Sequence, residues 1–482
     1  MAANFEMEAR LAYLRWLAAE DQAAQKWIRT LREYFDGQHP TFLTERMEEF
    51  LALKAKDSKH QFSHNLCRLV VEAVVERLAV TGFAPKAAQG ENTVSPLATA
   101  SAEWWEANRM DAGEDDLYEA ALRDAVSFLI VDWDAAEMRP RWSINYAFDG
   151  TQGVKVHRDA DTDRILFASK RWQVQDDAML ARSGRTRLTL YWPDRVEKWI
   201  SAQGQASGRW SDLGWEPYET PDEPWPIPWL DASGVALGMP VIAFENPGGS
   251  EIGDVIPLQD MLNKSDLDLI AASDAAGFRI LWASGLKAQI DPATGKEMAI
   301  TIGPSNLVRM GDPQARMGAI EPADLEKLIN GSKYWVESIA GVSRTPQYLF
   351  QAHGGDQPSG ESLKNQREGL TDKVARRQKV FGNAWEDAIY LSARLWNLYR
   401  TADAVEIERL STLWAPADRR DGKEVLEEAQ IKSGLGVPDE QIWAELGYDQ
   451  AQIQRFLQLR VEAQQRQETV GSFLLRNFDR GQ

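Results

Sequence analysis

An amphipathic pattern without proline runs from residue 363 to residue 399 and constrains the fold more than any other feature of the chain. Its apolar residues recur at helical spacing: Leu363, Leu370, Val374, Phe381, Trp385, Ile389, Leu395 and Tyr399. At 1.5 Å per residue, a helix of about 38 residues would be roughly 57 Å long, which is more than a compact domain needs. The pattern therefore predicts an extended architecture.

The segment in front of this helix, TPQYLFQAHGGDQPSGESLKNQ at 345–366, is polar and rich in glycine. It follows another helical pattern at 321–341, which opens with Pro322, a residue type suited to the first helical turn. Ser359 has a side chain that can cap the long helix. This composition suits a flexible functional loop, and an ordinary interhelical loop is the alternative.

The remaining segments differ in periodicity. Short stretches rich in β-branched and aromatic residues predict an antiparallel β region from about 140 to 245. Helical spacing returns at 257–283, and a segment of β and turn character follows. The first 130 residues are predicted to be mainly helical, with helical patterns at 5–31, 65–83, 97–108 and 115–131.

Composition excludes several classes of protein. The chain has 482 residues, enough for two or more domains, and its formal net charge of −19 disfavours binding nucleic acid over a broad surface. No uncharged apolar run is long enough to span a bilayer, so we expect no membrane partner. Cys67 is the only cysteine, which excludes an intrachain disulfide.

Motifs that would indicate an enzyme are incomplete. A GKE tripeptide lacks the other residues of a phosphate-binding loop. His60 and His64 lie one helical turn apart, but Gln61 stands where a zinc protease needs Glu, and no third ligand is evident. The run DADTDRILFASK has Arg164 and Lys170 where a calcium loop needs Gly and Glu, so it predicts a hairpin turn. We therefore expect no catalytic residue, no cofactor and no bound metal.

Two features suggest other functions. Tryptophans crowd the β region and, with carboxylates, are typical of a carbohydrate-binding or glycoside-cleaving protein, although packing within a layer or interface is favoured. They are Trp172, Trp192, Trp199, Trp210, Trp215, Trp225 and Trp229. The segment EAQIKSGLGVPDEQIWAELGYDQAQIQRF resembles a helix-turn-helix, but Asp439, Glu440 and Glu445 would face phosphates with the wrong sign.

Several segments resemble the portal proteins of tailed double-stranded DNA bacteriophages. They are YFDGQHP, VVEAVVERLAVTGF, GAIEPADLEKLI, ESIAGVSRTPQYLF, GGDQPSGESLK and RRQKVFGNAWEDAI. The similarity covers about residues 5–460, is specific at 320–400, and weakens in the β region and the tail. It implies an α+β subunit that assembles into a ring, usually a dodecamer, around a central channel.

The resemblance also implies a division of the chain. The wing would comprise 1–256, helical first and β-rich from about 140. A two-helix stem would enclose a small clip, and a long helix and a helical crown would follow. The expected segments are stem helix 1 at 257–283, the clip at 284–320, stem helix 2 at 321–344, the tunnel loop region at 345–362, the long helix and return to the wing at 363–415, and the C-terminal crown at 416–482.

By the same resemblance, the glycine-rich loop is a tunnel loop that lets DNA slide. Its candidate residues are His353, Gly354, Gly355, Asp356, Gln357, Pro358, Ser359 and Gly360. Basic residues of the long helix are candidates for contact with DNA or with a neighbouring subunit: Lys364, Arg367, Lys373, Arg376, Arg377 and Lys379. A solvated face with ion pairs to interleaved acidic residues is the alternative.

The resemblance finally implies a location and partners. The ring would lie at the unique portal vertex of the virion's capsid, would be assembled in the host cytoplasm, and would pass double-stranded DNA during packaging and ejection. Its partners would be identical subunits, the translocating DNA, the terminase large subunit, a head–tail adaptor, the major capsid protein and a scaffold. Terminase would supply the energy, so we expect no enzymatic activity in this chain.

Overall fold

The computed structural model describes most of the chain between residues 22 and 460. The described residues are 22–40, 63–86, 95–174, 184–202, 214–221, 223–277, 281–284, 314, 316–319, 324–350, 360–418, 422–446, 448, 452–453, 455–457 and 459–460. The chain divides into a first unit, Met1–Gln38, Asn65–Ile256 and Ala340–Gln482, and a second unit, His39–His64 and Pro257–Ile339. Both helices and strands are present, which confirms a mixed α and β chain.

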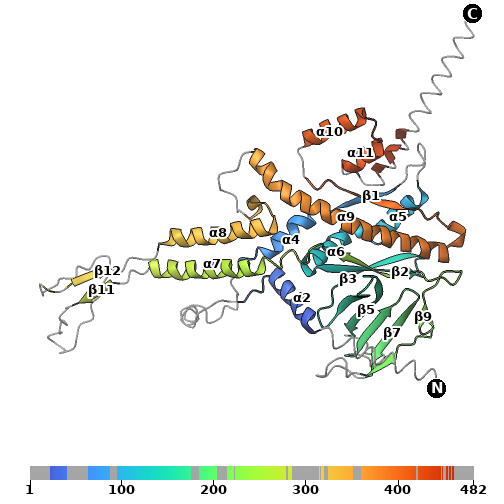
Figure 1. The fold of residues 1–482 in the computed structure, drawn as a ribbon, viewed down its shortest axis with the longest axis horizontal. Coiled ribbons are helices and arrows are strands. Elements are labelled where there is room, and N and C mark those ends of the chain that lie inside the picture. The colour runs from blue at the N-terminus through green and yellow to red at the C-terminus, as the bar shows by residue number, and fades with distance from the viewer. Residues whose placement is uncertain are drawn as a thin grey trace, which may run out of the picture. The chain divides into compact units, whose positions relative to one another are not determined.

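Short helices and one long helix form the helical part of the first unit (Figure 1). They are α2 (Gln22–Phe35), α4 (Cys67–Val75), α5 (Pro96–Ala107), α6 (Met110–Asp124) and α9 (Gly360–Tyr399). The start of α5 follows directly from the sequence, because Ser95 Oγ accepts a hydrogen bond from the Ala98 amide at 3.0 Å and Pro96 needs no amide partner.

Three strands lie against α6 and α9. They are β2 (Val126–Asp134), β3 (Arg139–Tyr146) and β10 (Val241–Glu245), paired antiparallel in the order β10-β2-β3. The predicted helix at 115–131 was wrong in its second half. Ala125 adopts a left-handed φ of 72° and ends α6, and the apolar run that follows is the buried strand β2. A short buried apolar run suits either structure, so periodicity alone did not distinguish them.

A six-stranded antiparallel sheet contains most of the predicted β region. Its strands are β4 (Gly153–Arg158), β5 (Ile165–Gln173), β6 (Thr186–Tyr191), β7 (Arg195–Ser201), β8 (Trp215–Pro217) and β9 (Ile227–Pro228), with β9 also pairing β7. Trp199 and Trp215 are buried in its core beside Phe167. The predicted hairpin turn is confirmed, because β4 and β5 pair antiparallel and the Asp159 amide donates to Arg164 O at 2.9 Å.

The long helix α9 confirms the strongest prediction from the sequence, with 40 residues from Gly360 to Tyr399. The predicted stripe is buried from Leu370 to Leu395, whereas Tyr399 is 49% exposed and stacks on Trp133 at 4.7 Å. Gly382 lies where α9 comes close to β13 (Leu410–Trp414), which pairs with β1 (Val80–Pro85). A Cβ on that residue would lie 3.3 Å from Trp414 Nε1.

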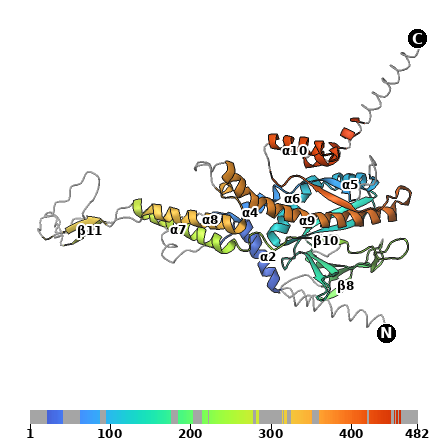
Figure 2. The same cartoon turned by 45° about the horizontal axis from the view of Figure 1, so that its top comes forward.

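The second unit contains two neighbouring helices, α7 (Ile256–Gly277) and α8 (Leu325–Ser343), which lie side by side in both views (Figures 1 and 2). Between them in sequence, β11 (Leu281–Ser284) pairs antiparallel with β12 (Arg316–Ala319). The helix predicted at 257–283 therefore ends earlier, at Gly277, and its last predicted residues form a strand.

Short helices follow the long one. They are the 3-10 turn η3 (Thr401–Asp403), α10 (Gly422–Gly434) and α11 (Asp439–Glu445). None of the helices in the described part of the chain is both long enough and apolar enough to cross a membrane.

A buried carboxyl group links α6, β1 and α9. The Val80 amide and the Tyr118 hydroxyl donate to Glu114 Oε2 at 3.1 and 3.0 Å, and Trp385 Nε1 donates to the Tyr118 oxygen at 2.7 Å. Burial raises the pKa of Glu114 to about 8, although both hydrogen bonds oppose the rise. Glu114 is therefore protonated in the folded protein at neutral pH.

This raised pKa predicts a pH-dependent stability. The stabilisation that protonated Glu114 adds to the free energy of unfolding is complete below pH 4.5. Above pH 4.5 it falls by up to about 1.4 kcal/mol per pH unit, and it is lost as the pH rises through about 8. Glu114→Gln should remove this slope from the free energy of unfolding, measured by denaturant titration at pH 5 and pH 8. Glu137→Gln, at an exposed turn, is the control. An unchanged slope in Glu114→Gln would show that Glu114 is already charged in the fold.

Candidate functional site

The predicted loop lies between α8 and α9, and the structure describes its two ends. Residues 353–359 lie outside the described residues, Gly360 is the first residue of α9, and the side chain of Lys364 is also outside the described set. The loop leaves from the end of α8 and returns at α9, and the candidate site is built from these two segments.

The C-terminus of α8 is fixed by its own backbone. Arg344 has a left-handed φ of 51°, and its amide donates to Gly341 O at 3.3 Å. The next amide, of Thr345, donates to Ala340 O at 3.1 Å. This pair of reversed hydrogen bonds is a Schellman motif, in which glycine is the usual left-handed residue. An arginine in that conformation is strained, so neighbouring contacts must hold it there.

Contacts with α9 supply that support. Arg367 lies over the Tyr348 ring with its guanidinium carbon 5.9 Å from the centroid, and Tyr348 belongs to the 3-10 turn η2 (Gln347–Leu349). Lys373 Nζ donates to Ser343 O, at the end of α8, at 2.8 Å. The chain that leaves α8 is therefore fastened to the N-terminal half of α9.

Lys373 also belongs to a buried ion cluster. Glu251 Oε2 lies 2.5 Å from Lys373 Nζ, and Glu251 Oε1 lies 2.5 Å from Arg377 Nη2. Arg377 Nε further donates to Asn246 Oδ1 at 3.1 Å. Lys373 is 7% exposed and Arg377 is 8% exposed. We call Glu251, Lys373, Arg377 and Asn246 the Glu251 cluster.

The charges in this cluster depend on one another. Burial acts to raise the pKa of Glu251, but Lys373 and Arg377 hold it below its ordinary value. Burial lowers the pKa of Lys373, and Glu251 opposes that shift. Buried ion pairs add little stability relative to apolar residues, but removal of one partner leaves an uncompensated buried charge. The cluster therefore specifies an arrangement more than it strengthens the fold.

Glu251 is itself held in place by α6. It belongs to residues 246–255, which we call the lead-in segment because they precede α7. The Glu251 amide donates to Leu122 O at 2.8 Å, the Asn246 amide donates to Ala125 O at 2.9 Å, and Ser250 Oγ donates to Arg123 O at 2.6 Å. The lead-in segment is thus fixed to the end of α6 on one side and to α9 on the other.

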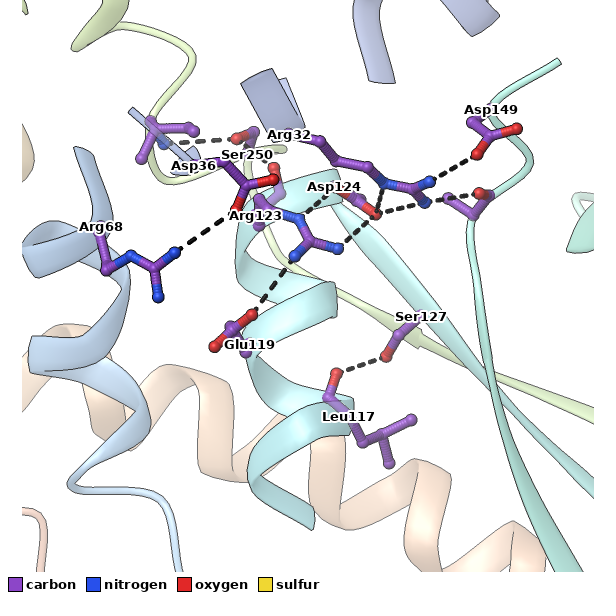
Figure 3. Close-up of polar contacts among 12 residues, drawn as sticks. Arg32, Asp36, Arg68, Leu117, Glu119, Arg123, Asp124, Ser127, Asp149 and Ser250 are labelled. Atoms are coloured by element: carbon purple, nitrogen blue, oxygen red, sulfur yellow. Dashed lines mark hydrogen bonds and ion pairs between the residues drawn. The ribbon is translucent and has the colours of Figure 1, made fainter. Parts of the chain in front are cut away.

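A network of ion pairs holds the same end of α6 (Figure 3). Arg123 lies between Glu119 and Asp124, at 3.3 and 2.8 Å, and Arg32 from α2 bridges Asp124 and Asp149, at 2.8 and 2.9 Å. The Asp124 side chain is fully buried, so its charge needs both arginines. The network fixes the carbonyl groups to which the lead-in segment binds.

The structure separates the predicted basic residues into two sets. Arg376 and Lys379 are exposed and Arg367 is half-buried, so contact with DNA or with a neighbouring subunit stays a prediction for these three. Lys373 and Arg377, by contrast, are buried and paired with Glu251 within the subunit, which argues against the predicted contacts for these two. Helical position alone does not reveal a partner carboxylate 126 residues away in sequence.

The residues that sequence reasoning missed are Glu251, Asn246 and Ser250. They lie in ENPGGSEIGDV, which predicts a turn and shows no spacing related to α9. The one available signal was a surplus of basic residues near Leu370 and Val374, where the helix becomes buried.

The histidines considered as metal ligands do not come together as a described site. His60 lies outside the described residues, and His64 Nδ1 lies 3.0 Å from Asp266 Oδ2 in the second unit. Within the part of the chain that the structure describes, no group of three His, Cys, Asp or Glu side chains is placed to bind a metal ion.

Comparison with known proteins agrees with the resemblance seen in the sequence. A family model described as "Phage portal protein, SPP1 Gp6-like" matches residues 14–468. The portal protein of Mycobacterium phage D29 is 23% identical over 377 residues, which cover 72% of this chain and 67% of the relative. The portal protein of Mycobacterium phage L5 is 24% identical over 379 residues, with the same coverage.

The Glu251 cluster predicts unequal effects of three substitutions. Glu251→Ala leaves two buried cations unpaired and should lower the free energy of unfolding by about 3–5 kcal/mol in a guanidinium titration. Lys373→Met should cost less, because an apolar chain of similar length replaces one cation and leaves Glu251 paired with Arg377. Lys379→Met, at an exposed position of the same helix, is the control and should change the value by less than about 0.5 kcal/mol. Equal effects of all three would mean that the cluster is solvated.

Proposed function

The chain belongs to the SPP1 Gp6-like family of phage portal proteins, and we propose that it is the subunit of a ring that encloses the DNA channel at one capsid vertex. The observation that carries this proposal is the family match, which covers residues 14–468 of the 482. As a phage portal protein, the chain belongs to the virion capsid. The carbohydrate-binding alternative has no support, and the sheet tryptophans Trp199 and Trp215 pack in a core.

Each part of the proposed portal subunit is assigned to described helices and strands. The described helices and strands of the first unit up to Ile256 form the wing, α7 and α8 form the stem, and β11 with β12 belongs to the clip. The segment between η2 and α9 is the tunnel loop, and α10 with α11 belongs to the crown. The neighbouring helices of the second unit, with the antiparallel pair of β11 and β12 between them in sequence, support the stem and clip assignments.

The proposed tunnel loop needs a base that is fixed to the subunit and a tip that does not bind DNA tightly. The Schellman motif at Arg344 and the bond from Lys373 to Ser343 O support the first requirement. The glycines and the small polar residues from His353 to Gly360 support the second, since short side chains offer few pockets in which DNA would lodge. These residues would guide DNA and would not bind it tightly.

Charge supports transport without strong binding. The net charge of −19 disfavours tight contact with phosphates, and such contact would slow translocation and make it steeply salt-dependent. Lys364, Arg367, Arg376 and Lys379 remain candidates for weak contact with DNA or for contact with the next subunit. Terminase would supply the energy and would dock on the ring together with head–tail adaptors, and the capsid protein and a scaffold would surround it.

A variant of the loop tests the proposed transport role. Replacement of Gly354, Gly355 and Ser359 by tryptophan should leave the ring intact, because these residues lie beyond the fastened base. It should lower the yield of packaged DNA at least about tenfold, equivalent to some 1.4 kcal/mol in an effective barrier. The measurement is nuclease-protected DNA in a packaging reaction, with ring assembly checked by light scattering.

The matched control is Ala232→Trp, a bulky residue on an exposed loop of the wing, which should package normally. Normal packaging by the triple variant would contradict the role of the loop. Monomers or aggregates of the triple variant would show that these residues are structural.

A further inference from the structure

Helix α10 and the residue that follows it carry apolar side chains that their own subunit leaves uncovered. Ile431 is 63% exposed and Leu435 is 78% exposed. They are four residues apart at the end of the helix, where the Leu435 amide still donates to Ile431 O at 3.0 Å, so they lie on one side of it. Glu427, four residues before Ile431, is exposed on the same side. We call these three residues the α10 stripe.

A pocket lies near the C-terminal end of the described chain. It has a volume of about 460 Å³ and is lined by Trp443, Leu446, Tyr448, Phe456 and Leu459, together with Asp439 and Arg460. Phe456 meets Trp443 and Tyr448 edge-on, with ring centroids 5.4 and 5.3 Å apart. We call it the C-terminal pocket.

The chemistry of this pocket favours an apolar occupant. Its two charged lining residues, Asp439 and Arg460, form an ion pair with each other, so the aromatic and aliphatic side chains supply most of the contact surface. Leu459 is 54% exposed at the pocket, which places an aliphatic side chain in reach of a partner. Arg455 is exposed and lies four residues before Leu459, a helical spacing that places both on the same side.

The α10 stripe and the C-terminal pocket are complementary. On α10 an acidic residue precedes an exposed aliphatic residue by four positions, as Glu427 precedes Ile431. At the pocket a basic residue precedes an exposed aliphatic residue by the same four positions, as Arg455 precedes Leu459. Apolar surface can therefore meet apolar surface while the flanking charges attract each other.

We propose that the α10 stripe of one copy of this chain docks into the C-terminal pocket of the next copy. Ile431 and Leu435 enter the pocket beside Leu459, and Glu427 pairs with Arg455. Because the stripe and the pocket are different surfaces, the contact is heterologous, and repeated heterologous contacts close into a ring when the rotation between copies fits. The inference rests on the proposed ring and names two of its contact surfaces.

Cysteine cross-linking tests the contact in the full-length protein. Cys67 is the only native cysteine and is buried, so a thiol-reactive cross-linker should react with engineered cysteines alone. Leu435→Cys combined with Leu459→Cys, treated with a short bismaleimide, should give a ladder of covalent oligomers on a denaturing gel. Leu426→Cys with Leu459→Cys is the control, because Leu426 is 60% exposed but lies about 140° around α10 from Ile431.

Native mass spectrometry of the same untreated sample separates the two hypotheses. A ladder from the Leu435 pair but not from the Leu426 pair supports the contact. A ring mass without that ladder, or a link confined to single chains, overturns the contact and leaves the portal ring standing. Absence of both ring and ladder overturns both.

Exchange of the charges at Glu427 and Arg455 tests the proposed contact independently. Glu427→Arg should weaken association roughly two- to five-fold per interface, and addition of Arg455→Glu should restore it. The readout is the concentration at which the oligomer dissociates in native mass spectra. A double variant that stays as weak as the single variant would overturn the pairing of Glu427 with Arg455.

Discussion

One buried carboxylate, Glu251, compensates two buried cations of the long helix, and the arrangement around the loop base depends on this balance. Neither Lys373 nor Arg377 could occupy its place alone without a cost of several kcal/mol. Because main-chain bonds fix Glu251 to the end of α6 and Lys373 also holds Ser343 O, one cluster fixes the lead-in segment, the end of α8 and α9. A ring of identical subunits requires such fixed points, since each copy must present its loop at the same place.

Much of the fold was predictable because burial leaves a periodic trace in the sequence. The stripe of α9 from Leu370 to Leu395 follows helical spacing, and so does its burial. The strand β2 was not predictable, because Val126–Asp134 begins with an apolar run that suits a helix or a strand and only the left-handed Ala125 separates it from α6. Tyr399 fits the stripe but lies at its exposed end, stacked on Trp133 from another element. Such contacts depend on tertiary structure and leave no local pattern.

The helices that flank the predicted loop were predictable, but the partners of their basic residues were not. Composition identified the loop and the basic helix that follows it, but six basic residues look alike in sequence. Burial separates them: Lys373 and Arg377 hold the subunit together, whereas Arg376 and Lys379 face outward. The distinction matters for function, because only outward charges can meet DNA or a neighbour. A similar separation holds in the C-terminal helices, where exposed aliphatic residues of α10 suit contact between copies.

The central claim is that this chain works as a ring with an axial channel. The most direct test is the mass of the purified protein by native mass spectrometry, combined with electron microscopy of the same sample. The account predicts one closed assembly of about a dozen 54.2 kDa chains with a hole along its axis. A protein that stays monomeric at high concentration and also in the presence of capsid and scaffold proteins would contradict it.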